Sequence, residues 1–468
     1  MINIVYYNMP NKRSFILNLP QDFINKYQEL LGPEAAAFFD SFNQSSPGGY
    51  RINSNKASSL VDQSYVTNEQ VPYCRDGHYG HLNGKSIDHT TGYLYSQEPS
   101  AMYVGEVADP QQGEKVLDLC AAPGGKSTHL VAKMQNSGLL VSNEIFKARA
   151  KILAENLERW GAQNTVITNE SPEKLETQFP AFFDRILVDA PCSGEGMFRK
   201  DPAATQYWHK DYSNECANRQ QHILDSAVKM MHAGSTLIYS TCTFAPEEDE
   251  QIIDWFIRKY PQFTLVPIKK YSGMDDGRPE WGNDNPELTK TVRLFPHHMK
   301  GEGHFIAKLV WQAASGSKIV PTVKHPFRSV KLSKEQQTEL TEFLHSCLVN
   351  YQIRNLALFG DQLFDMPNGM PIIDKMSIVR PGVHLGTFKK RRFEPALGLA
   401  LAIDDDQVLN KLAITEEQWR QYVHGDTITV NDDYPKGWYL LTCQNHAVCF
   451  GKLVNKTVKN FYPKGLRF

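Results

Sequence analysis

The sequence lacks any uninterrupted apolar run near the roughly 18 residues that a membrane-spanning helix requires. Residues 1–20 also lack a basic start followed by an apolar stretch and a small-residue cleavage site, so we expect no signal peptide and a cytoplasmic location. The sequence also has no large excess of positive or negative residues. Its 50 Lys and Arg residues are balanced by 52 Asp and Glu residues, which leaves a net charge of −2.

Cysteine is sparse: the chain has eight cysteines in 468 residues, too few for a disulfide scaffold. No two of them form a C-x-x-C pair, and Cys443 and Cys449 have no second pair or suitable histidine cluster beside them. We therefore expect no structural zinc site and no other bound metal.

The length of 468 residues suggests about two to four domains, and 41% hydrophobic with 22% charged residues is ordinary for a folded protein. Residues 19–42 predict helices interrupted near Gly32 and Pro33. From about residue 93 to 310, short apolar strands alternate with helical segments. The expected strands are Val116–Leu119, Leu139–Ser142, Thr165–Thr168, Ile186–Asp189, Thr236–Ser240 and Phe305–Val310. Such alternation predicts an α/β fold with a mainly parallel sheet and helices on both faces.

The remainder of the chain has a different pattern. A small, polar segment at residues 313–317 is typical of a linker, and residues 333–349 predict a helix. Short β-like runs follow, at Leu397–Ile403, Trp438–Thr442 and Ala447–Leu453. This end of the chain is therefore expected to form one or two small β-rich domains.

A glycine-rich loop, Cys120–Lys126, follows the first of these strands and precedes a helical stretch. The triplet Gly125-Lys126-Ser127 resembles the end of a nucleotide-binding P-loop, but that motif needs glycine at the position of Cys120, so we reject it. Small residues at a strand-to-helix turn let a ligand approach the backbone closely. Glu144 ends the next strand, 19 residues after Gly125, a spacing that suits hydrogen bonds to ribose hydroxyls. A tight turn with a surface acid is the alternative interpretation.

Polar or reactive side chains stand at the ends of four expected strands, namely Asp118, Glu144, Asp189 and Cys242. Ligands of open parallel sheets bind beyond the carboxyl ends of the strands. We therefore expect these four side chains to meet in one crevice.

Three motifs carry a family resemblance: D-L-C-A-A-P-G-G-K at 118–126, D-A-P-C-S-G-E-G at 189–196 and Y-S-T-C-T at 239–243. Segments 95–102, 293–298 and 301–305 extend the match. Together they resemble the S-adenosylmethionine-dependent RNA cytosine-5 methyltransferases of the Sun family, and most of all the bacterial RsmF type, which methylates 16S ribosomal RNA. The resemblance implies a Rossmann-like class I methyltransferase core with a helical N-terminal domain and C-terminal α+β and PUA-like β-rich domains.

The resemblance also implies covalent catalysis, because carbon 5 of cytosine is too weak a nucleophile to take a methyl group directly. A thiolate that adds to carbon 6 makes carbon 5 reactive, and a base then removes the carbon-5 proton. By resemblance, Cys242 is the nucleophile, Asp189 contacts the edge of the cytosine ring, and Cys192 serves in release. For Cys74, Cys216, Cys347, Cys443 and Cys449 we expect packing roles, whereas Cys120 is expected to line the cofactor loop through its backbone. The acidic run at residues 246–250 is expected to begin a helix just after Cys242.

The implied cofactor is S-adenosyl-L-methionine. By resemblance its site comprises Cys120, Ala121, Ala122, Pro123, Gly124, Gly125, Lys126, Glu144, Ser171 and Asp189. Ser171 stands where the family carries an acidic residue, and its neighbour Glu170 is expected to point elsewhere. Lys126 is expected either to stabilise the cofactor carboxylate or to cap its helix.

Two basic segments are candidates for RNA contacts. Residues 437–468 contain five Lys or Arg residues and no Asp or Glu, interleaved with Phe461, Tyr462 and Phe468, and residues 388–393 contain four consecutive positive charges. Basic patches give salt-dependent affinity and aromatic rings stack on unpaired bases; a solvated basic face is the alternative interpretation. The target base must leave any stack to reach Cys242.

By resemblance we divide the chain into an N-terminal methyltransferase-associated domain (1–92), a catalytic domain (93–312), an intermediate domain (318–390) and a PUA-like RNA-binding domain (391–468). The expected partner is 16S ribosomal RNA, free or within the small subunit. Two alternatives stay open: a transfer RNA cytosine-5 methyltransferase, and a non-catalytic RNA-binding assembly factor.

Overall fold

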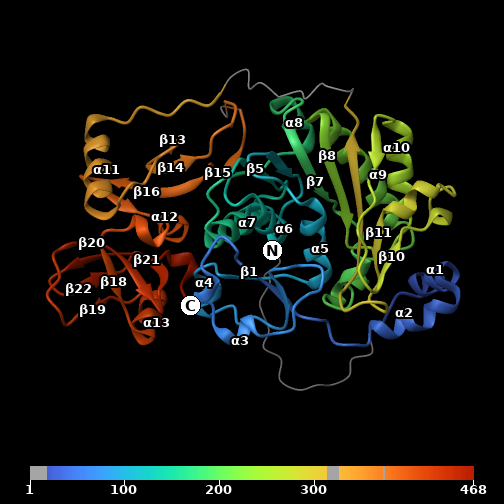
Figure 1. The fold of residues 1–468 in the computed structure, drawn as a ribbon, viewed down its shortest axis with the longest axis horizontal. Coiled ribbons are helices and arrows are strands. Elements are labelled where there is room, and N and C mark those ends of the chain that lie inside the picture. Colours follow the sequence, from blue (N-terminus) through green and yellow to red (C-terminus); the bar gives the residue numbers. More distant parts are fainter. Residues whose placement is uncertain (1–17, 314–325, 373–374) are drawn as a thin grey trace.

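The computed structural model describes residues 18–313, 326–372 and 375–468. Its centre is one twisted sheet, in which five adjacent parallel strands run in the order β8-β7-β4-β5-β6 (Figure 1). These strands are β4 (Lys115–Asp118), β5 (Leu139–Asn143), β6 (Thr165–Thr168), β7 (Phe183–Asp189) and β8 (Met231–Thr241). Antiparallel β12 (His304–Trp311) lies beside β8 and confirms the sixth expected strand. The parallel centre of the predicted sheet is thus confirmed, but the whole sheet is mixed, because antiparallel strands extend it at both edges.

Helices cover both faces of this sheet, because its strands are apolar on both sides. Leu117 of β4 packs in a core with the helices α8 (Pro172–Gln178), α9 (Tyr212–Lys229) and α10 (Glu250–Lys259). Its neighbour Val116 packs in the opposite core with α5 (Pro99–Ala108), α6 (Gly125–Met134) and α7 (Lys147–Trp160). Further strands extend the sheet at the β12 side: β9 (Phe263–Leu265), β10 (Met274–Asp276) and β11 (Val292–Leu294).

The N-terminal helices are α1 (Gln21–Leu31) and α2 (Ala35–Ser41), and the interruption falls at Gly32, as predicted. Gly32 ends α1 with a φ of 53°, a left-handed conformation that favours glycine. The pair buries an aromatic face against the catalytic part of the chain, including Phe244 and Phe295. A three-stranded sheet follows, formed by β1 (Gly49–Ile52), β2 (Gly77–Tyr79) and β3 (Leu94–Ser96), with the short helices α3 (Gln63–Val66) and α4 (Ile87–Thr90).

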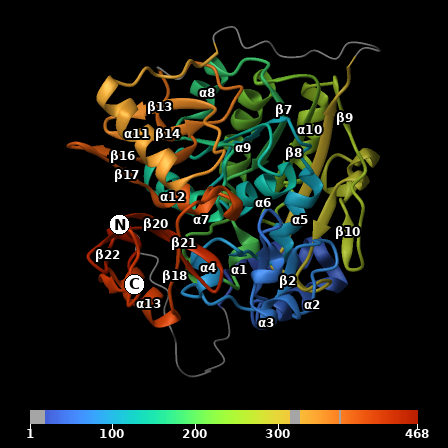
Figure 2. The same cartoon turned by 60° about the vertical axis from the view of Figure 1, so that its left-hand side comes forward.

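The C-terminal part begins with α11 (Lys334–Cys347), which confirms the predicted helix. A four-stranded sheet contains β13 (Asn355–Phe359), β14 (Gln362–Met366), β16 (Val383–Lys389) and β17 (Arg392–Pro395). A five-stranded sheet contains β18 (Lys411–Ala413), β19 (Ile428–Thr429), β20 (Gly437–Cys443), β21 (His446–Val454) and β22 (Thr457–Lys459), beside α13 (Glu416–His424) (Figure 2). Two of the expected β-like runs are confirmed as β20 and β21.

The third expected run, Leu397–Ile403, is not a strand. Residues Leu397–Ala402 form the helix α12, which is buried along its whole length between α7, β16 and β21. When every residue of a short segment is apolar, the spacing of apolar residues cannot distinguish a helix from a strand. A helix that is apolar on all sides is stable when it is buried between other elements, as this one is.

The hairpin of β16 and β17 spans residue 390, at which we expected one domain to end. In addition, β15 (Ile378–Arg380) leaves the C-terminal sheets and pairs antiparallel with β6 of the central sheet. The division into four domains remains a prediction. The expected linker at 313–317 lies, except for Ala313, outside the described residues. Across the described ranges, no helix is both long and apolar enough to cross a membrane.

Candidate active site

The ends of four neighbouring parallel strands meet at one edge of the central sheet, and they carry the four predicted side chains. Asp118 ends β4, Glu144 follows β5, Asp189 ends β7 and Cys242 follows β8. Asp118 is fully buried and accepts a hydrogen bond from Ser127 Oγ at 2.7 Å. Burial raises the pKa of Asp118 to about 7, and its contact with Ser127 places it in the core beside the first turn of α6.

The glycine-rich loop joins β4 to α6 and is held from behind by α7. Arg149 Nη2 donates to the carbonyl of Ala122 at 2.8 Å, and Asn156 Nδ2 donates to the carbonyl of Pro123 at 2.7 Å. Gly124 has a φ of 117°, and a Cβ there would lie 3.2 Å from Leu153, so both its conformation and its surroundings favour glycine. The loop therefore presents a fixed, small-residue backbone at the N-terminus of α6.

Glu144 is buried, and it caps the turn after β5 by accepting from the Phe146 backbone N–H at 2.9 Å. The two residues after it, Ile145 and Phe146, are 54% and 63% exposed. Sequence reasoning did not identify this apolar pair, although its position directly after Glu144 was visible in the sequence. Two large apolar side chains in water beside a carboxylate offer a surface that a planar ring can cover.

Ser171 lies at the N-cap of α8, half-buried, and its side chain makes no capping hydrogen bond. Its neighbour Glu170 is turned away, as expected. The Glu170 carboxylate accepts from Lys174 Nζ at 2.8 Å and from the Ser377 backbone N–H at 2.6 Å. Glu170 thus holds the segment that leads to β15, and Ser171 is the residue left beside the crevice.

Lys126 connects the glycine-rich loop to Asp189. Its Nζ lies 2.7 Å from Asp189 Oδ2, while Ser240 Oγ donates to Asp189 Oδ1 at 2.8 Å. Burial alone would lower the pKa of Lys126, but the Asp189 carboxylate outweighs it and raises this pKa. The Lys126 ammonium thus pairs with the Asp189 carboxylate at the end of β7 rather than capping its own helix.

The two motif cysteines face each other across the ends of β7 and β8. Their Sγ atoms are 3.4 Å apart, and both are free thiols. The contact with Cys242, followed by burial, raises the pKa of the Cys192 thiol well above its usual value. Cys192 therefore keeps its proton at neutral pH.

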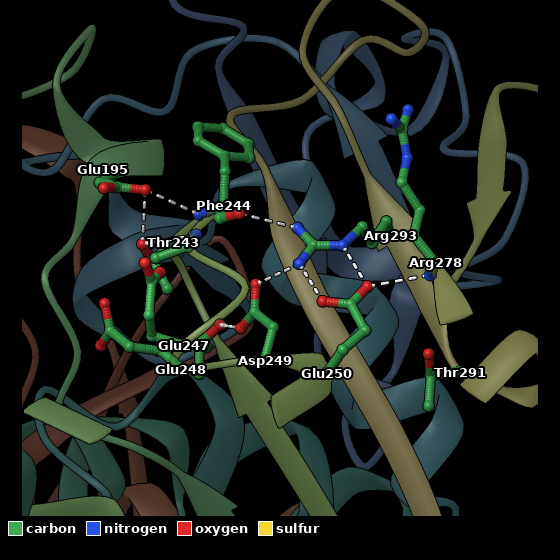
Figure 3. A network of polar contacts seen from close by, with 12 residues as sticks. Glu195, Thr243, Phe244, Glu247, Glu248, Asp249, Glu250, Arg278, Thr291 and Arg293 are labelled. Atoms are coloured by element: carbon green, nitrogen blue, oxygen red, sulfur yellow. Dashed lines mark hydrogen bonds and ion pairs between the residues drawn. The ribbon is translucent and has the colours of Figure 1, made fainter. Parts of the chain in front are cut away.

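The acidic run after Cys242 differs from the expectation that it begins a helix. Residues 246–249 form a turn, and α10 begins at Glu250. Because the turn folds inward, Glu248, Asp249 and Glu250 are fully buried and do not form an exposed acidic helix start. Arg293 pairs with Asp249 at 3.0 Å and with Glu250 (Figure 3).

Sequence reasoning also missed Glu195, although the motif at 189–196 contains it. Glu195 is fully buried beside the cysteines, between their loops and the N-terminal helices. Its hydrogen-bond partners come from positions up to 168 residues away, which no local pattern reveals.

The predicted RNA-contact segments differ in exposure. Lys389 and Lys390, together with Arg391 and Arg392, are exposed at the tip of the β16–β17 hairpin. In the last segment Phe468 is exposed, but Tyr462 is buried in the domain core and Phe461 packs on Trp438. Of the three aromatic side chains proposed for stacking, only Phe468 is placed to contact a base.

Among the described residues, two groups of His, Cys and carboxylate side chains come within metal-binding distance of one another, and neither contains Cys192 or Cys242. One contains Glu34, His297 and His298, and the other Cys74, Glu106 and His129. Arg278 already lies 3.1 Å from the Glu34 carboxylate, and Lys133 pairs with Glu106. Each carboxylate therefore already has a protein cation.

Family models match four parts of the chain. They are the N-terminal domain of 16S rRNA methyltransferase RsmF (residues 19–99), 16S rRNA methyltransferase RsmB/F (106–310), the RsmF first C-terminal domain (342–403) and the RsmF PUA domain (409–468). Among solved structures, a methyltransferase homologue from Pyrococcus horikoshii is 29% identical, with a TM-score of 0.55 over 63% of this chain and 95% of that one. The predicted fold class is confirmed.

Curated relatives match along nearly the whole chain. The ribosomal RNA small subunit methyltransferase F of Escherichia coli O81 is 30% identical over 481 residues, which cover 96% of each protein. The protein of the same name from Erwinia tasmaniensis is 28% identical with the same coverage. The predicted resemblance is confirmed, and the chain belongs to the RsmF family of 16S rRNA methyltransferases.

Proposed function

We propose that this protein transfers a methyl group from S-adenosylmethionine to carbon 5 of a cytidine in 16S ribosomal RNA. The observation that carries the proposal is the pair of free thiols, 3.4 Å apart at the ends of adjacent parallel strands. Cytosine-5 methylation needs one thiol for attack and a second group for release, and this crevice offers both. Its relatives, which are named ribosomal RNA small subunit methyltransferase F, support 16S ribosomal RNA as the substrate.

The Cys242 thiolate forms a bond to carbon 6 of the cytosine, and the electron pair of the 5,6 double bond becomes available at carbon 5. Asp189 faces the ring edge, with Lys126 and Ser240 fixing its carboxylate, so a proton at ring nitrogen 3 has a partner there. Carbon 5 takes up the methyl group that S-adenosylmethionine supplies as a sulfonium. A solvent base beside Cys192 then takes the carbon-5 proton, and the electron pair of that carbon–hydrogen bond restores the 5,6 double bond. The carbon 6–sulfur bond breaks at the same time, and Cys242 leaves as a thiolate.

The residues that would hold the cofactor fit an adenosyl group with an amino-acid tail. The backbone of the Cys120–Lys126 loop approaches the tail, and the Glu144 carboxylate accepts from ribose hydroxyls. Phe146 and Ile145 cover one face of the adenine ring, and the Ser171 hydroxyl is available at its edge. Asp189 borders the tail and the cytosine together, which brings the methyl group toward carbon 5.

RNA binding is assigned to the C-terminal part of the chain. The exposed basic tip of the β16–β17 hairpin supplies phosphate contacts, and the region that matches the RsmF PUA model carries the remaining basic residues. We infer from such a substrate, free or within the small subunit, that the protein acts in the cytoplasm.

Bisulfite sequencing of total RNA from a strain that lacks this gene tests the proposal. We expect one or more 16S cytidines to lose their methylation and to regain it when the gene is restored. If methylation is lost only in transfer RNA, the protein is instead a transfer RNA cytosine-5 methyltransferase. Unchanged methylation of both RNAs, together with no binding of S-adenosylmethionine in calorimetry, would favour the non-catalytic assembly factor.

A further inference from the structure

Each of the two cysteines lies between residues that are anchored by buried groups. On the Cys192 side, the carbonyl of Pro191 accepts from Gln220 Nε2 at 3.2 Å, and the backbone N–H of Ser193 donates to Glu248 Oε2 at 3.0 Å. Gln220 also donates to the same Glu248 oxygen at 2.9 Å. The backbone is therefore held on both sides of Cys192.

The Cys242 side has a matching arrangement around Glu195. Glu195 Oε2 accepts from Thr243 Oγ1 at 2.9 Å and from the Phe244 backbone N–H at 3.2 Å (Figure 3). The carbonyl of Cys242 accepts from the Gly196 backbone N–H at 2.9 Å. The loop that carries Cys242 is thus fastened to the loop that carries Cys192.

Each of the two carboxyl groups holds the loop of the other cysteine. Glu248 comes from the segment after Cys242 but holds the Cys192 loop, whereas Glu195 comes from the segment after Cys192 but holds the Cys242 loop. The two hydroxyls between them, Ser193 Oγ and Thr243 Oγ1, are 2.8 Å apart. One continuous chain of polar contacts therefore runs from Glu248 through Ser193 and Thr243 to Glu195.

Each hydroxyl in this chain has only one proton to donate. Thr243 gives its proton to Glu195, so the contact between the hydroxyls needs the proton of Ser193. The remaining contact, between Ser193 Oγ and Glu248 Oε1, then needs a proton from Glu248. The chain thus places a neutral acid at Glu248 and a carboxylate at Glu195.

Independent observations agree with both ends of the chain. Burial raises the pKa of Glu248 to about 8, which keeps it neutral at pH 7. At the other end, four donors converge on the two Glu195 oxygens, because Tyr27 Oη and Trp208 Nε1 also donate to it. A carboxylate that carries no proton accepts all four.

We propose that Glu195 and Glu248 are positioning residues, the first ionised and the second neutral, that together set the two thiols for their separate steps. Glu195 holds Cys242 for attack on carbon 6, and Glu248 holds Cys192 for release. This inference rests on the proposed function, and it assigns roles to two residues that touch neither RNA nor cofactor.

Glutamine variants separate the two roles, because glutamine imitates a neutral acid and not a carboxylate. In Glu248→Gln the amide N–H₂ donates to Ser193 Oγ and the amide oxygen accepts from Gln220 and Ser193, so this variant should restore turnover lost in Glu248→Ala. In Glu195→Gln the side-chain amide N–H₂ replaces a carboxylate oxygen that accepts a hydrogen bond. The N–H₂ then faces another donor, so the loop that carries Cys242 should shift. A displacement of about 1 Å can cost about 100-fold in rate.

The experiment measures methyl transfer to 16S transcripts, with kcat and KM determined separately, and the covalent protein–RNA species on denaturing gels. We expect Glu195→Gln to lower kcat about 100-fold, with little adduct and an RNA KM close to that of the unchanged protein. Glu248→Ala should accumulate adduct through Cys242, and Glu248→Gln should not. Thr243→Val, which keeps the shape but removes the hydroxyl, should lower kcat more than Thr243→Ser and serves as a second test if Glu195→Gln fails to fold.

The outcomes are distinguishable from those that test the proposed function. If the unchanged protein neither methylates 16S RNA nor forms an adduct, the proposed function itself fails. If the unchanged protein is active and Glu195→Gln is equally fast, Glu195 does not position Cys242. If Glu248→Gln is as slow as Glu248→Ala, the neutral-acid assignment is wrong.

Discussion

The most distinctive residue of the candidate cofactor site is Phe146, which is 63% exposed and contacts water where a ligand ring would lie. An exposed phenylalanine adds little to the stability of the protein, but it contributes to affinity when a bound ring removes it from water. Its effect should therefore appear in ligand binding and not in unfolding.

We expect Phe146→Ala to weaken binding of S-adenosylmethionine about tenfold, since partial burial of a phenylalanine contributes roughly 1.5 kcal/mol. Its thermal unfolding should stay unchanged. Isothermal calorimetry measures the affinity, and Ile152→Ala is the matched control, because Ile152 on α7 is also exposed, at 42%. Equal affinities of Phe146→Ala and the unchanged protein would remove Phe146 from the cofactor site.

Among individual residues, the sequence could predict the location of those that stand at the ends of strands. Asp189 and Cys242 lie together because parallel strands end at the same edge of a sheet. The pairing of Glu195 with Thr243 and the direction of Lys126 toward Asp189 could not be predicted. These contacts depend on how two loops and the N-terminal helices pack, and no local periodicity encodes that packing.

At the scale of elements, the β16–β17 hairpin is the clearest candidate RNA contact. Its basic tip is exposed, while the flanking Phe388 and Phe393 are buried and anchor it to the sheet. Arg392 is partly neutralised by Glu394, at 2.7 Å, which leaves Lys389, Lys390 and Arg391 as the better phosphate contacts.

The double variant Lys389→Gln, Lys390→Gln should bind 16S transcripts more weakly and with a flatter salt dependence. Each lost phosphate contact lowers the slope of log K against log salt by roughly 0.7–0.9. Filter binding over a range of salt concentrations measures this slope, and Lys229→Gln, at the end of α9, serves as the control. A double variant with an unaltered slope would mean that the hairpin does not contact RNA.

Elements of the central sheet could be predicted because strands buried on both faces are continuous apolar runs between turns. The same property misled the prediction for Leu397–Ile403, which is equally apolar but forms α12. The turn at 246–249 was missed for another reason: acidic residues usually indicate an exposed helix start, and here Arg293 lies in the core to pair with them.

At the scale of the whole molecule, four histidines are packed in positions that disfavour their charged form. Burial lowers the pKa of His89, His129, His297 and His304 to about 4. The unfolded chain binds these protons near pH 6.5, so the unfolded state holds more protons than the folded state between pH 6.5 and 4. Stability contributed by the neutral rings is therefore lost as the pH falls through this window.

Burial also raises the pKa of Asp118, Glu248 and Asp249, and their protonation opposes this trend, so the contribution of one ring is isolated with a variant. Thermal unfolding of the unchanged protein and of His89→Gln is followed from pH 7 to pH 4.5. The stability of the unchanged protein should fall more steeply than that of His89→Gln, by up to about 1.4 kcal/mol per pH unit for the one ring removed. Parallel pH profiles of the two proteins would contradict the neutral state of His89.

The covalent role of Cys242 is the central claim, and one measurement tests it most directly. Purified Cys192→Ala, Cys242→Ala and the double variant are incubated with 16S transcript and S-adenosylmethionine, then separated on a denaturing gel. Cys192→Ala should run as a slow protein–RNA species that ribonuclease removes, because attack and methylation proceed while release fails. Cys242→Ala and the double variant should show no such species. An adduct in Cys242→Ala and none in Cys192→Ala would make Cys192 the nucleophile and contradict the account.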